Sequence, residues 1–279
     1  MAQPALRLDT NVPGEFFVDS TCIDCDACRI FAPSVFRDEG GLSAVYHQPE
    51  TDEERLAAHK ALVSCPTSSI GAESSSRAAL DALPEVIDDD VERCGYTSES
   101  SFGAISYFLR GPQILIDSPR FVAPLVKRLG NVRRMLLTHQ DDIADHAKFH
   151  ARFGCERLLH FDDARGRVFE SMPRGREPLD LGDGVVMIPT PGHTRGHVVF
   201  LYRNRYLFTG DHLAWSESRG HLYAFRSACW YSWSEQIRSM EGLLDYDFEW
   251  VLPGHGRPVH LPREEMRTSL ERCIAWMKK

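Results

Sequence analysis

The stretch THQDDIADH, from Thr138 to His146, places two histidines and three aspartates in eight consecutive positions. It directly follows the apolar run Met135–Leu137, which we predict to be a buried strand. In α/β proteins, functional groups gather where strands end at the edge of a sheet. The stretch therefore predicts one arm of a metal site and, with it, an enzyme.

Three more residues of the ligand type follow in glycine-rich turns: His193 in TPGHTRGH, Asp211 after Gly210, and His255 in PGHG. Glycine lets the backbone bend sharply and approach an ion closely. We expect these residues to meet the first arm at neighbouring strand ends. The predicted ligand set is His139, Asp145, His146, His193, Asp211 and His255.

The composition of the 279-residue chain is that of a globular protein, with 43% hydrophobic and 10% aromatic residues. The sequence contains neither a long apolar run nor a secretory leader pattern, which predicts a cytoplasmic protein that binds no membrane. The net charge of −8 disfavours nucleic acid as a partner. Eleven acidic and four basic residues fall between Glu15 and Glu73, so this segment forms a separate acidic unit.

Four of the eight cysteines lie in this acidic segment, as Cys22-x-x-Cys25-x-x-Cys28 and, much later, Cys65-Pro66. Three thiolates on one loop and a distant fourth can enclose an iron–sulfur cube. Zinc also accepts four thiolates, but its ligands usually come as two separated pairs. Reduced core thiols are the remaining alternative, and the spacing favours iron–sulfur.

On these residues, positions 14–73 resemble a bacterial-type ferredoxin, whose motif is C-x-x-C-x-x-C-x-x-x-C-P. The fourth cysteine of that motif, which serves a second cluster in two-cluster members, is replaced here by Ala32 before Pro33. The resemblance implies a small α+β domain that holds one [4Fe–4S] cluster through Cys22, Cys25, Cys28 and Cys65. Its acidic surface implies a basic redox partner.

We divide the chain into a tail (1–13), the ferredoxin-like domain (14–73), a linker (74–84) and a second domain (85–279). Paired strands are expected over 101–109 and 113–116. Strands and helices alternate afterwards, including helices over 121–129, 144–153, 234–244 and 262–277. This order predicts an α/β protein in which helices cover two sheets, an αββα sandwich.

The ordered motifs of residues 85–279 resemble those of the metallo-β-lactamase superfamily, which binds one or two metal ions. The resemblance implies that His139 and His193 serve one ion, that Asp145, His146 and His255 serve the other, and that Asp211 lies between them. Zinc is the expected metal, with iron or manganese as alternatives. We assign His197 and His212 to the layer that hydrogen-bonds the ligands and fixes their orientation.

One departure from the family pattern His-x-His-x-Asp-His concerns the second histidine, which is absent here. Asp141 or Asp142 is the natural substitute, and Asp141 keeps the family's first interval. A carboxylate in place of an imidazole makes the site harder, which favours iron or manganese over zinc. Flavodiiron relatives also carry a carboxylate at this point.

The resemblance implies a hydrolase that acts on a small molecule, with metal-activated water attacking an ester, thioester, lactone or phosphoester. Asp145 would orient that water, and the cluster domain would be accessory. One alternative is an oxidoreductase whose non-haem iron site is linked to the cluster. A second is a non-enzymatic redox sensor. Metal content separates the three, because zinc favours hydrolysis, iron favours redox chemistry and an empty site favours the sensor.

Overall fold

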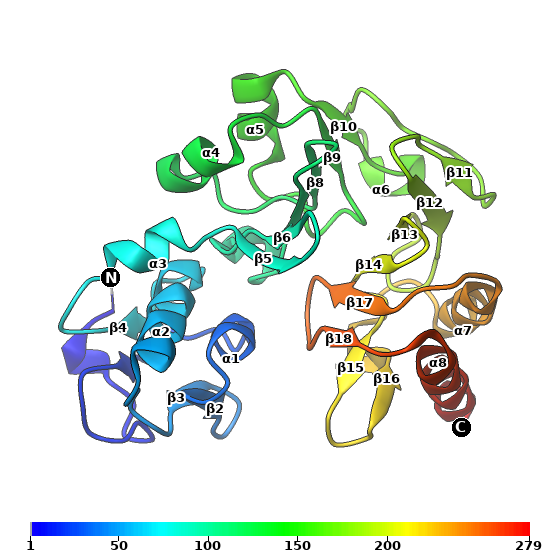
Figure 1. The fold of residues 1–279 in the computed structure, drawn as a ribbon. Coiled ribbons are helices and arrows are strands. Elements are labelled where there is room, and N and C mark those ends of the chain that lie inside the picture. Colours follow the sequence, from blue (N-terminus) through cyan, green and yellow to red (C-terminus); the bar gives the residue numbers. More distant parts are fainter. Residues whose placement is uncertain (1) are drawn as a thin grey trace. The chain divides into compact units, whose positions relative to one another are not determined.

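The computed structural model describes residues 2–279, which form two compact units (Figure 1). The first unit runs through Val132 and includes Ala144–Phe153, and the second comprises Arg133–Ile143 and Gly154–Lys279. These units divide the chain at other points than the predicted domains do, because the cysteine-bearing segment and residues 85–132 fall in one unit.

The cysteine-bearing segment is a small α+β structure. Its antiparallel pairs are β1 (Phe17–Val18) with β4 (Ile70–Gly71) and β2 (Phe36–Asp38) with β3 (Ser43–Val45). Its helices are α1 (Ala27–Phe31) and α2 (Asp52–Ser64). Helix α2 begins with a capping box in which the Thr51 hydroxyl accepts from the backbone N–H of Glu54 and the Glu54 carboxylate accepts from that of Thr51.

The residues predicted to be a tail pack onto this structure. They include the 3₁₀ turn η1 (Pro4–Leu6), and the buried Asn11 amide accepts from the backbone N–H groups of Val18 and Val45 at 2.9 and 3.0 Å. The predicted linker likewise contains helix α3 (Arg77–Asp81), whose Ala79 is fully buried. Both segments are short, so hydrophobic periodicity does not reveal this packing.

The remainder of the first unit contains four consecutive antiparallel strands and two helices. The strands are β5 (Glu85–Asp88), β6 (Val91–Arg93), β7 (Tyr107–Leu109) and β8 (Ile114–Ile116). The helices are α4 (Ala123–Leu129) and α5 (His146–Phe153). The strand expected over 101–109 is limited to its last three residues, because the 3₁₀ turn η2 (Glu99–Ser101) and the tight turn after it occupy the preceding positions.

Hydrogen bonds to the end of α2 and one ion pair join the cysteine-bearing segment to residues 85–132 within this unit. The carbonyl of Ser64, at the end of α2, accepts from the N–H and the hydroxyl of Thr97 at 3.1 and 2.7 Å. The carbonyl of Val63 accepts from the Arg120 guanidinium at 3.0 Å. Lys60 pairs with Glu85 at 2.8 Å. These bonds satisfy the last carbonyls of α2, which a helix leaves without internal partners.

The second unit contains a parallel pair, β9 (Arg134–Leu136) and β10 (Glu156–Leu158), and a six-stranded sheet. The sheet order is β11 (Leu179–Asp180), β12 (Val185–Pro189), β13 (Val198–Tyr202), β14 (Tyr206–Gly210), β17 (Trp250–Pro253) and β18 (Val259–His260). All neighbours are antiparallel except β14 and β17. A hairpin of β15 (Ala214–Ser216) and β16 (His221–Tyr223) completes the strands, and α6 (Phe161–Ala164) follows β10.

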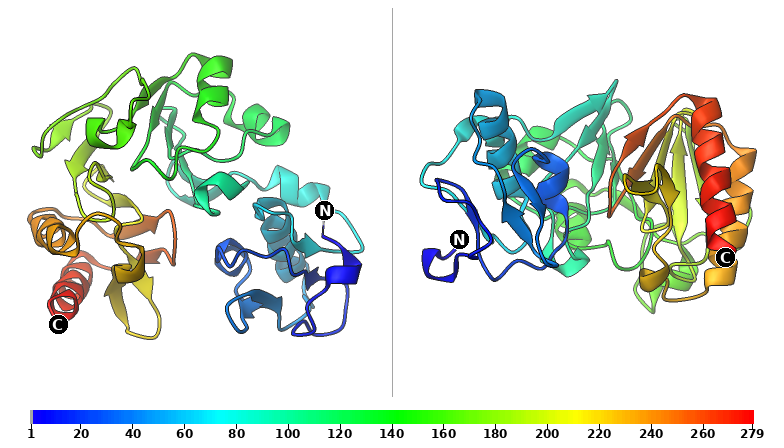
Figure 2. Two further views of the ribbon diagram at one scale, coloured as in Figure 1. Left: turned by 180° about the vertical axis from the view of Figure 1, so that it is seen from behind. Right: turned by 90° about the horizontal axis from the view of Figure 1, so that it is seen from below.

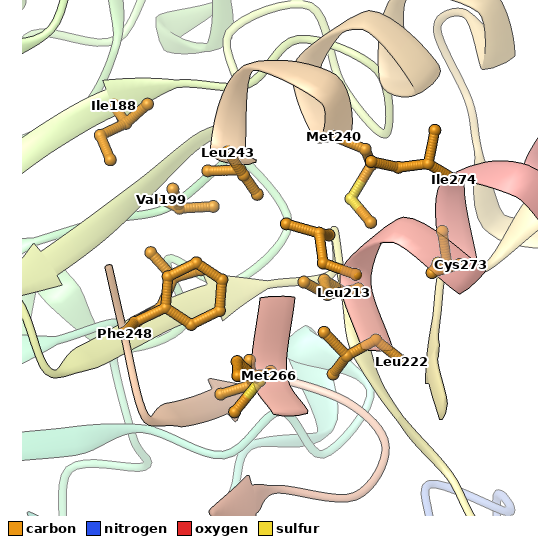
Figure 3. Close-up of a cluster of buried hydrophobic side chains, with 14 of the residues drawn as sticks. Ile188, Val199, Leu213, Leu222, Met240, Leu243, Phe248, Met266, Cys273 and Ile274 are labelled. Carbon is orange, nitrogen blue, oxygen red and sulfur yellow. The ribbon is translucent and has the colours of Figure 1, made fainter. Parts of the chain in front are cut away.

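Two helices, α7 (Trp233–Gly242) and α8 (Arg263–Met277), pack side by side on this sheet (Figure 2). Their apolar side chains join those of β12 and β13 in one buried cluster (Figure 3). It includes Ile188, Val199, Met240, Leu270 and Ile274. Alternate residues of the strands face this cluster, and the helical spacing of the apolar residues on α8 explains why this helix buries one face. None of the helices among residues 2–279 is both long and apolar enough to cross a membrane.

We expect substitution of Gly103 by alanine to disturb the cysteine loop, because a Cβ on Gly103 would lie 2.6 and 2.7 Å from Cβ and Sγ of Cys25. Gly130 also has positive φ (72° against 83° for Gly103), but a Cβ there would meet nothing within 4 Å. Gly130→Ala therefore costs only the backbone strain, about 1–2 kcal/mol, and Gly103→Ala costs more. The melting temperatures of the two variants test this, and equal losses would contradict it.

Candidate metal centre

Three of the predicted ligands lie at one edge of the six-stranded sheet, because three of its strands run in the same direction. Strand β12 is antiparallel to β13 and β13 to β14, while β14 is parallel to β17. The carboxyl ends of β12, β14 and β17 therefore share an edge. His193, Asp211 and His255 follow these three ends.

The Thr138–Ile143 loop is fastened to the same edge. It leaves β9, and its Thr138 carbonyl accepts from the backbone N–H of Val198, the first residue of β13, at 2.9 Å. The backbone N–H of Gly254 donates to the carbonyl of Gly210 at 2.9 Å, which holds the turns after β14 and β17 together. The loop and the turns thus bring ligand-type side chains from distant parts of the sequence into one place.

Four side-chain atoms of this group face a common point. The Nε2 atom of His139 lies 3.9 Å from Asp141 Oδ2 and 3.7 Å from Asp211 Oδ2. The Nε2 atom of His193 lies 3.6 and 3.7 Å from the same two oxygens. Ligand atoms about 2.1 Å from a tetrahedral ion are about 3.4 Å apart. His139, Asp141 and His193 form a group whose ligand atoms all lie within 4.8 Å of one another, and Asp211 Oδ2 lies 3.7 Å from both imidazoles.

The chemistry of the two imidazoles also fits a cation. His139 is fully buried and His193 is 2% exposed, and Nε2 of each has no hydrogen-bond partner among the described residues. Burial lowers the pKa of His139 to about 4, although the nearby Asp211 carboxylate opposes the shift. The His193 imidazole, 3.6 Å away, lowers the pKa of Asp141. Neutral imidazoles and ionised carboxylates are the forms that bind metal.

Asp141 and Asp142 reach His139 from different sides. The Asp141 carboxylate faces Nε2, whereas Asp142 Oδ2 lies 3.9 Å from Nδ1. Nδ1 also hydrogen-bonds the Thr138 hydroxyl at 3.0 Å. The Asp141 side chain is 46% exposed and that of Asp142 only 1%. Since Nδ1 of His139 is occupied by Thr138, Nε2 is the nitrogen that can bind an ion, and Asp141 is the carboxylate beside it.

The second group of ligand-type residues lies deeper. Asp142, His139 and Asp211 have ligand atoms within 4.8 Å of one another. A Cβ on Gly254 would lie 2.7 Å from Asp142 Oδ2 and 3.2 Å from Asp211 Oδ1, so glycine is required at this position. His255 Nδ1 lies 2.6 Å from Asp211 Oδ1. Burial alone would raise the pKa of Asp211, but His255, His139 and His193 together lower it.

The other two predicted ligands, Asp145 and His146, belong to the first unit, and neither ligand group includes them. Asp145 Oδ2 accepts from the backbone N–H of Phe121 at 2.7 Å, and its Oδ1 pairs with Lys148 at 2.8 Å. His146 is the first residue of α5. The Asp145 carboxylate thus binds the segment before α4 to the start of α5, a use that the sequence pattern does not reveal.

Further buried histidines surround the ligand group. His197 Nδ1 hydrogen-bonds the Thr190 hydroxyl at 3.0 Å, and its ring stacks on His212 with 5.3 Å between centroids. The His212 carbonyl accepts from the Gln236 amide at 3.0 Å. Burial lowers the pKa of both histidines, that of His212 to about 3. The neutral His197 ring packs against His139 and His193, and His212 packs behind it.

Asp163 is a residue of this site that sequence reasoning missed. Its buried carboxylate accepts from the backbone N–H of Gln140 at 3.1 Å, from the Thr194 hydroxyl at 2.6 Å and from the backbone N–H of Gly196 at 2.7 Å. It thereby ties the loop that carries His139 and Asp141 to the turn that carries His193. Its one sequence signal is its position just after β10, the strand beside β9.

The four clustered cysteines line one cavity of the first unit. Cys22, Cys25, Cys28 and Cys65 surround it together with apolar and hydroxyl side chains. The backbone N–H of Ser69 donates to Cys65 Sγ at 3.3 Å. Burial raises the pKa of Cys25 to about 12 and that of Cys28 further. Buried thiols of this kind become thiolates only when cations compensate their charge, so the cavity suits a cationic iron cluster.

The comparisons with known proteins agree with this arrangement. Residues 18–72 match the family model for the 4Fe-4S single cluster domain of Ferredoxin I. Hydroxyacylglutathione hydrolase of Acidiphilium cryptum (strain JF-5) is 38% identical over 89 residues, which are 30% of this chain and 36% of that protein. The chain thus matches about a third of the length of this curated relative.

Solved structures are similar at lower identity. VMB-1 superposes with a TM-score of 0.54 at 16% identity over 70% of this chain and 95% of that one. The metallo-β-lactamase DIM-1 has a TM-score of 0.51 at 16% identity, covering 67% and 96% of the two chains. FIM-1 from Pseudomonas aeruginosa, in its mono-zinc form, has 0.51 at 14%, covering 68% and 93%.

The predicted α/β architecture is confirmed: the protein has a metallo-β-lactamase fold that follows a small single-cluster ferredoxin-like region.

We expect Asp163→Asn to weaken metal binding, because an amide has one acceptor oxygen where the carboxylate receives three donors from two ligand-bearing segments. The loss should be about 10- to 100-fold in metal affinity, measured by competition with a chelator. Asp162→Asn is the matched control, since this side chain is 35% exposed and contacts only Arg195 in the site region. Equal affinity in the two variants would contradict a positioning role for Asp163.

Proposed function

We propose that this protein is a metal-dependent hydrolase with an accessory [4Fe–4S] cluster. The observation that carries the proposal is the arrangement of His139, His193, Asp141 and Asp211, in which each imidazole Nε2 lies 3.6–3.9 Å from an oxygen of both carboxylates. Buried imidazole nitrogens without protein partners support it, because such nitrogens are costly unless an ion or water satisfies them.

A divalent ion in such a site supplies a Lewis acid that polarises a carbonyl or phosphoryl oxygen and makes water nucleophilic near neutral pH. The protein's own part is to hold the ion and keep one side open. His139 and His193 are buried, whereas the Asp141 side chain is 46% exposed, so a substrate reaches the site from the Asp141 side. Asp211 accepts from His255 through Oδ1, which leaves Oδ2 facing the two imidazoles.

A second ion is proposed beside Asp211 and His255. On the family pattern alone, Asp145 and His146 would complete its ligands and Asp145 would orient the attacking water. The buried Asp142 is the competing carboxylate, since it lies within ligand distance of Asp211. Zinc is the expected metal for hydrolysis, and the two carboxylates also suit iron or manganese.

The substrate class is proposed as a small ester, thioester, lactone or phosphoester. Thioesters come first for testing, because the A. cryptum relative carries the name of a glutathione thioester hydrolase. An oxidoreductase remains the second candidate, because the ligand set is rich in carboxylates and the same chain has a cysteine cavity suited to a cluster. In that case the site would hold iron, and the acidic ferredoxin-like region would dock on a basic redox partner.

We expect chelation to abolish thioester hydrolysis and added zinc to restore it. Asp141→Asn should lower metal affinity by at least about 100-fold, because a ligand matters more than its supporting partners. The exposed Glu217→Gln serves as control. The measurements are metal analysis and initial rates with a panel of thioesters and esters. Iron in the site without hydrolysis would favour the oxidoreductase, and full affinity in Asp141→Asn would exclude this ligand set.

The same metal analysis separates the two carboxylates of the second ion. Loss of the second equivalent in Asp145→Asn supports the family pattern, whereas its loss only in Asp142→Asn assigns that role to Asp142.

We also expect anaerobically purified protein to hold about four irons with acid-labile sulfide in the cysteine cavity. Cys65→Ser should lose this cluster, because its thiolate supplies the distant fourth ligand, while Cys229→Ser should keep it. Iron and sulfide analysis with electron paramagnetic resonance after reduction measures both. Wild-type protein without sulfide, whose zinc content falls in Cys65→Ser, would instead indicate a zinc site in the cysteine cavity.

A further inference from the structure

Trp230 stands out on the surface of the second unit because it is a large aromatic side chain that is 67% exposed beside a candidate metal ligand. Its ring centroid lies 6.2 Å from that of His193, at an interplanar angle of 58°. Single exposed apolar residues are common on proteins and need no explanation by themselves. The surroundings of Trp230 provide the further evidence.

The backbone around Trp230 is fixed to the ligand turn. The N–H groups of Trp230 and Tyr231 both donate to the carbonyl of His193, at 2.9 and 3.0 Å. The N–H of Ser232 donates to the carbonyl of Gly192 at 3.0 Å, and Cys229 Sγ donates to the same carbonyl at 3.2 Å. Ser232 then caps helix α7. These hydrogen bonds therefore fix the backbone that carries the indole to the turn that carries His193.

The nearby Trp233 shows what an aromatic residue with a structural role does in this segment. Its indole N–H donates to the carbonyl of Met277 at 3.1 Å, and its ring packs edge-on against Trp276 with 6.1 Å between centroids. Trp230 instead directs most of its surface to solvent beside the imidazole that faces Asp141. Asp141, 3.6 Å from the same imidazole, is also exposed, at 46%.

We propose that Trp230 forms the apolar wall of the substrate site and selects substrates with an aromatic or flat apolar group within a few bonds of the reacting carbonyl. This inference rests on the proposed hydrolase function and names its substrate class. An indole offers a broad rigid face with little side-chain entropy to lose, and aromatic pairs stack in offset or edge-on geometry. A carbonyl held near His193 Nε2 brings its substituent to this face.

The test uses two carboxylates, 2-naphthoate and acetate, which resemble products with and without an aromatic group. Isothermal titration calorimetry on the zinc-loaded full-length protein measures both affinities. We expect naphthoate to bind more tightly than acetate, and the stacking contribution to be about three- to tenfold. Trp230→Ala should reduce this preference by that factor, and Trp230→Phe should keep part of it.

Tyr231→Ala is the matched control, because Tyr231 is the adjacent exposed aromatic residue, at 44% exposure. It should keep the preference for naphthoate. The proposal is overturned if wild-type protein does not prefer naphthoate, if Trp230→Ala keeps the full preference, or if Tyr231→Ala loses it equally.

Rates with benzoyl and acetyl thioesters of one thiol separate this inference from the proposed function. Hydrolysis of both thioesters without a Trp230-dependent difference in KM leaves the hydrolase in place and rejects the specificity role. Absence of hydrolysis together with Trp230-dependent naphthoate binding rejects thioester hydrolysis and keeps an aromatic binding site.

Discussion

The direction of three strands is the constraint on which the candidate metal centre depends. Because β12, β14 and β17 run the same way, the turns that follow them open at one edge of the sheet. Each turn carries one ligand-type side chain, and glycine next to it allows the backbone to come close. The helices α7 and α8 pack on one face of the sheet through their apolar side chains. This apolar core fixes the geometry of the polar site at the edge of the sheet.

A network of backbone and carboxylate hydrogen bonds then brings the Thr138–Ile143 loop to this edge. The Asp163 carboxylate accepts hydrogen bonds from the loop and from the His193 turn, and the backbone N–H of Val198, at the start of β13, donates to the Thr138 carbonyl. With these bonds in place, a carboxylate can take the position where the family pattern has a second histidine. The change alters the hardness and charge of the ligand set, while the surrounding bonds keep its shape.

Much of the architecture could be predicted from the sequence, because apolar periodicity marks the strands of the second sheet and the long helices. The glycine-flanked His193, Asp211 and His255 could also be placed at strand ends on their local pattern. Asp163 and Trp230 could not, since their importance arises from hydrogen bonds and exposure that only the folded chain creates. The segment around Asn11 was predicted to be a tail because its packing depends on one buried amide rather than on apolar side chains.

The bonds between α2 and residues 85–132 have a consequence for any attempt to isolate the hydrolase-like half. A fragment that begins at residue 85 would strip Thr97 and Arg120 of the carbonyls of Ser64 and Val63 that they bind, and Glu85 of Lys60. The surface of residues 85–132 beneath these bonds would become solvent-exposed, including Arg93, whose guanidinium carbon lies 4.4 Å from the centroid of the Phe31 ring in the intact chain. The ferredoxin-like region is thus an integral part of the fold of the first unit. The candidate metal centre should therefore be studied on the intact chain.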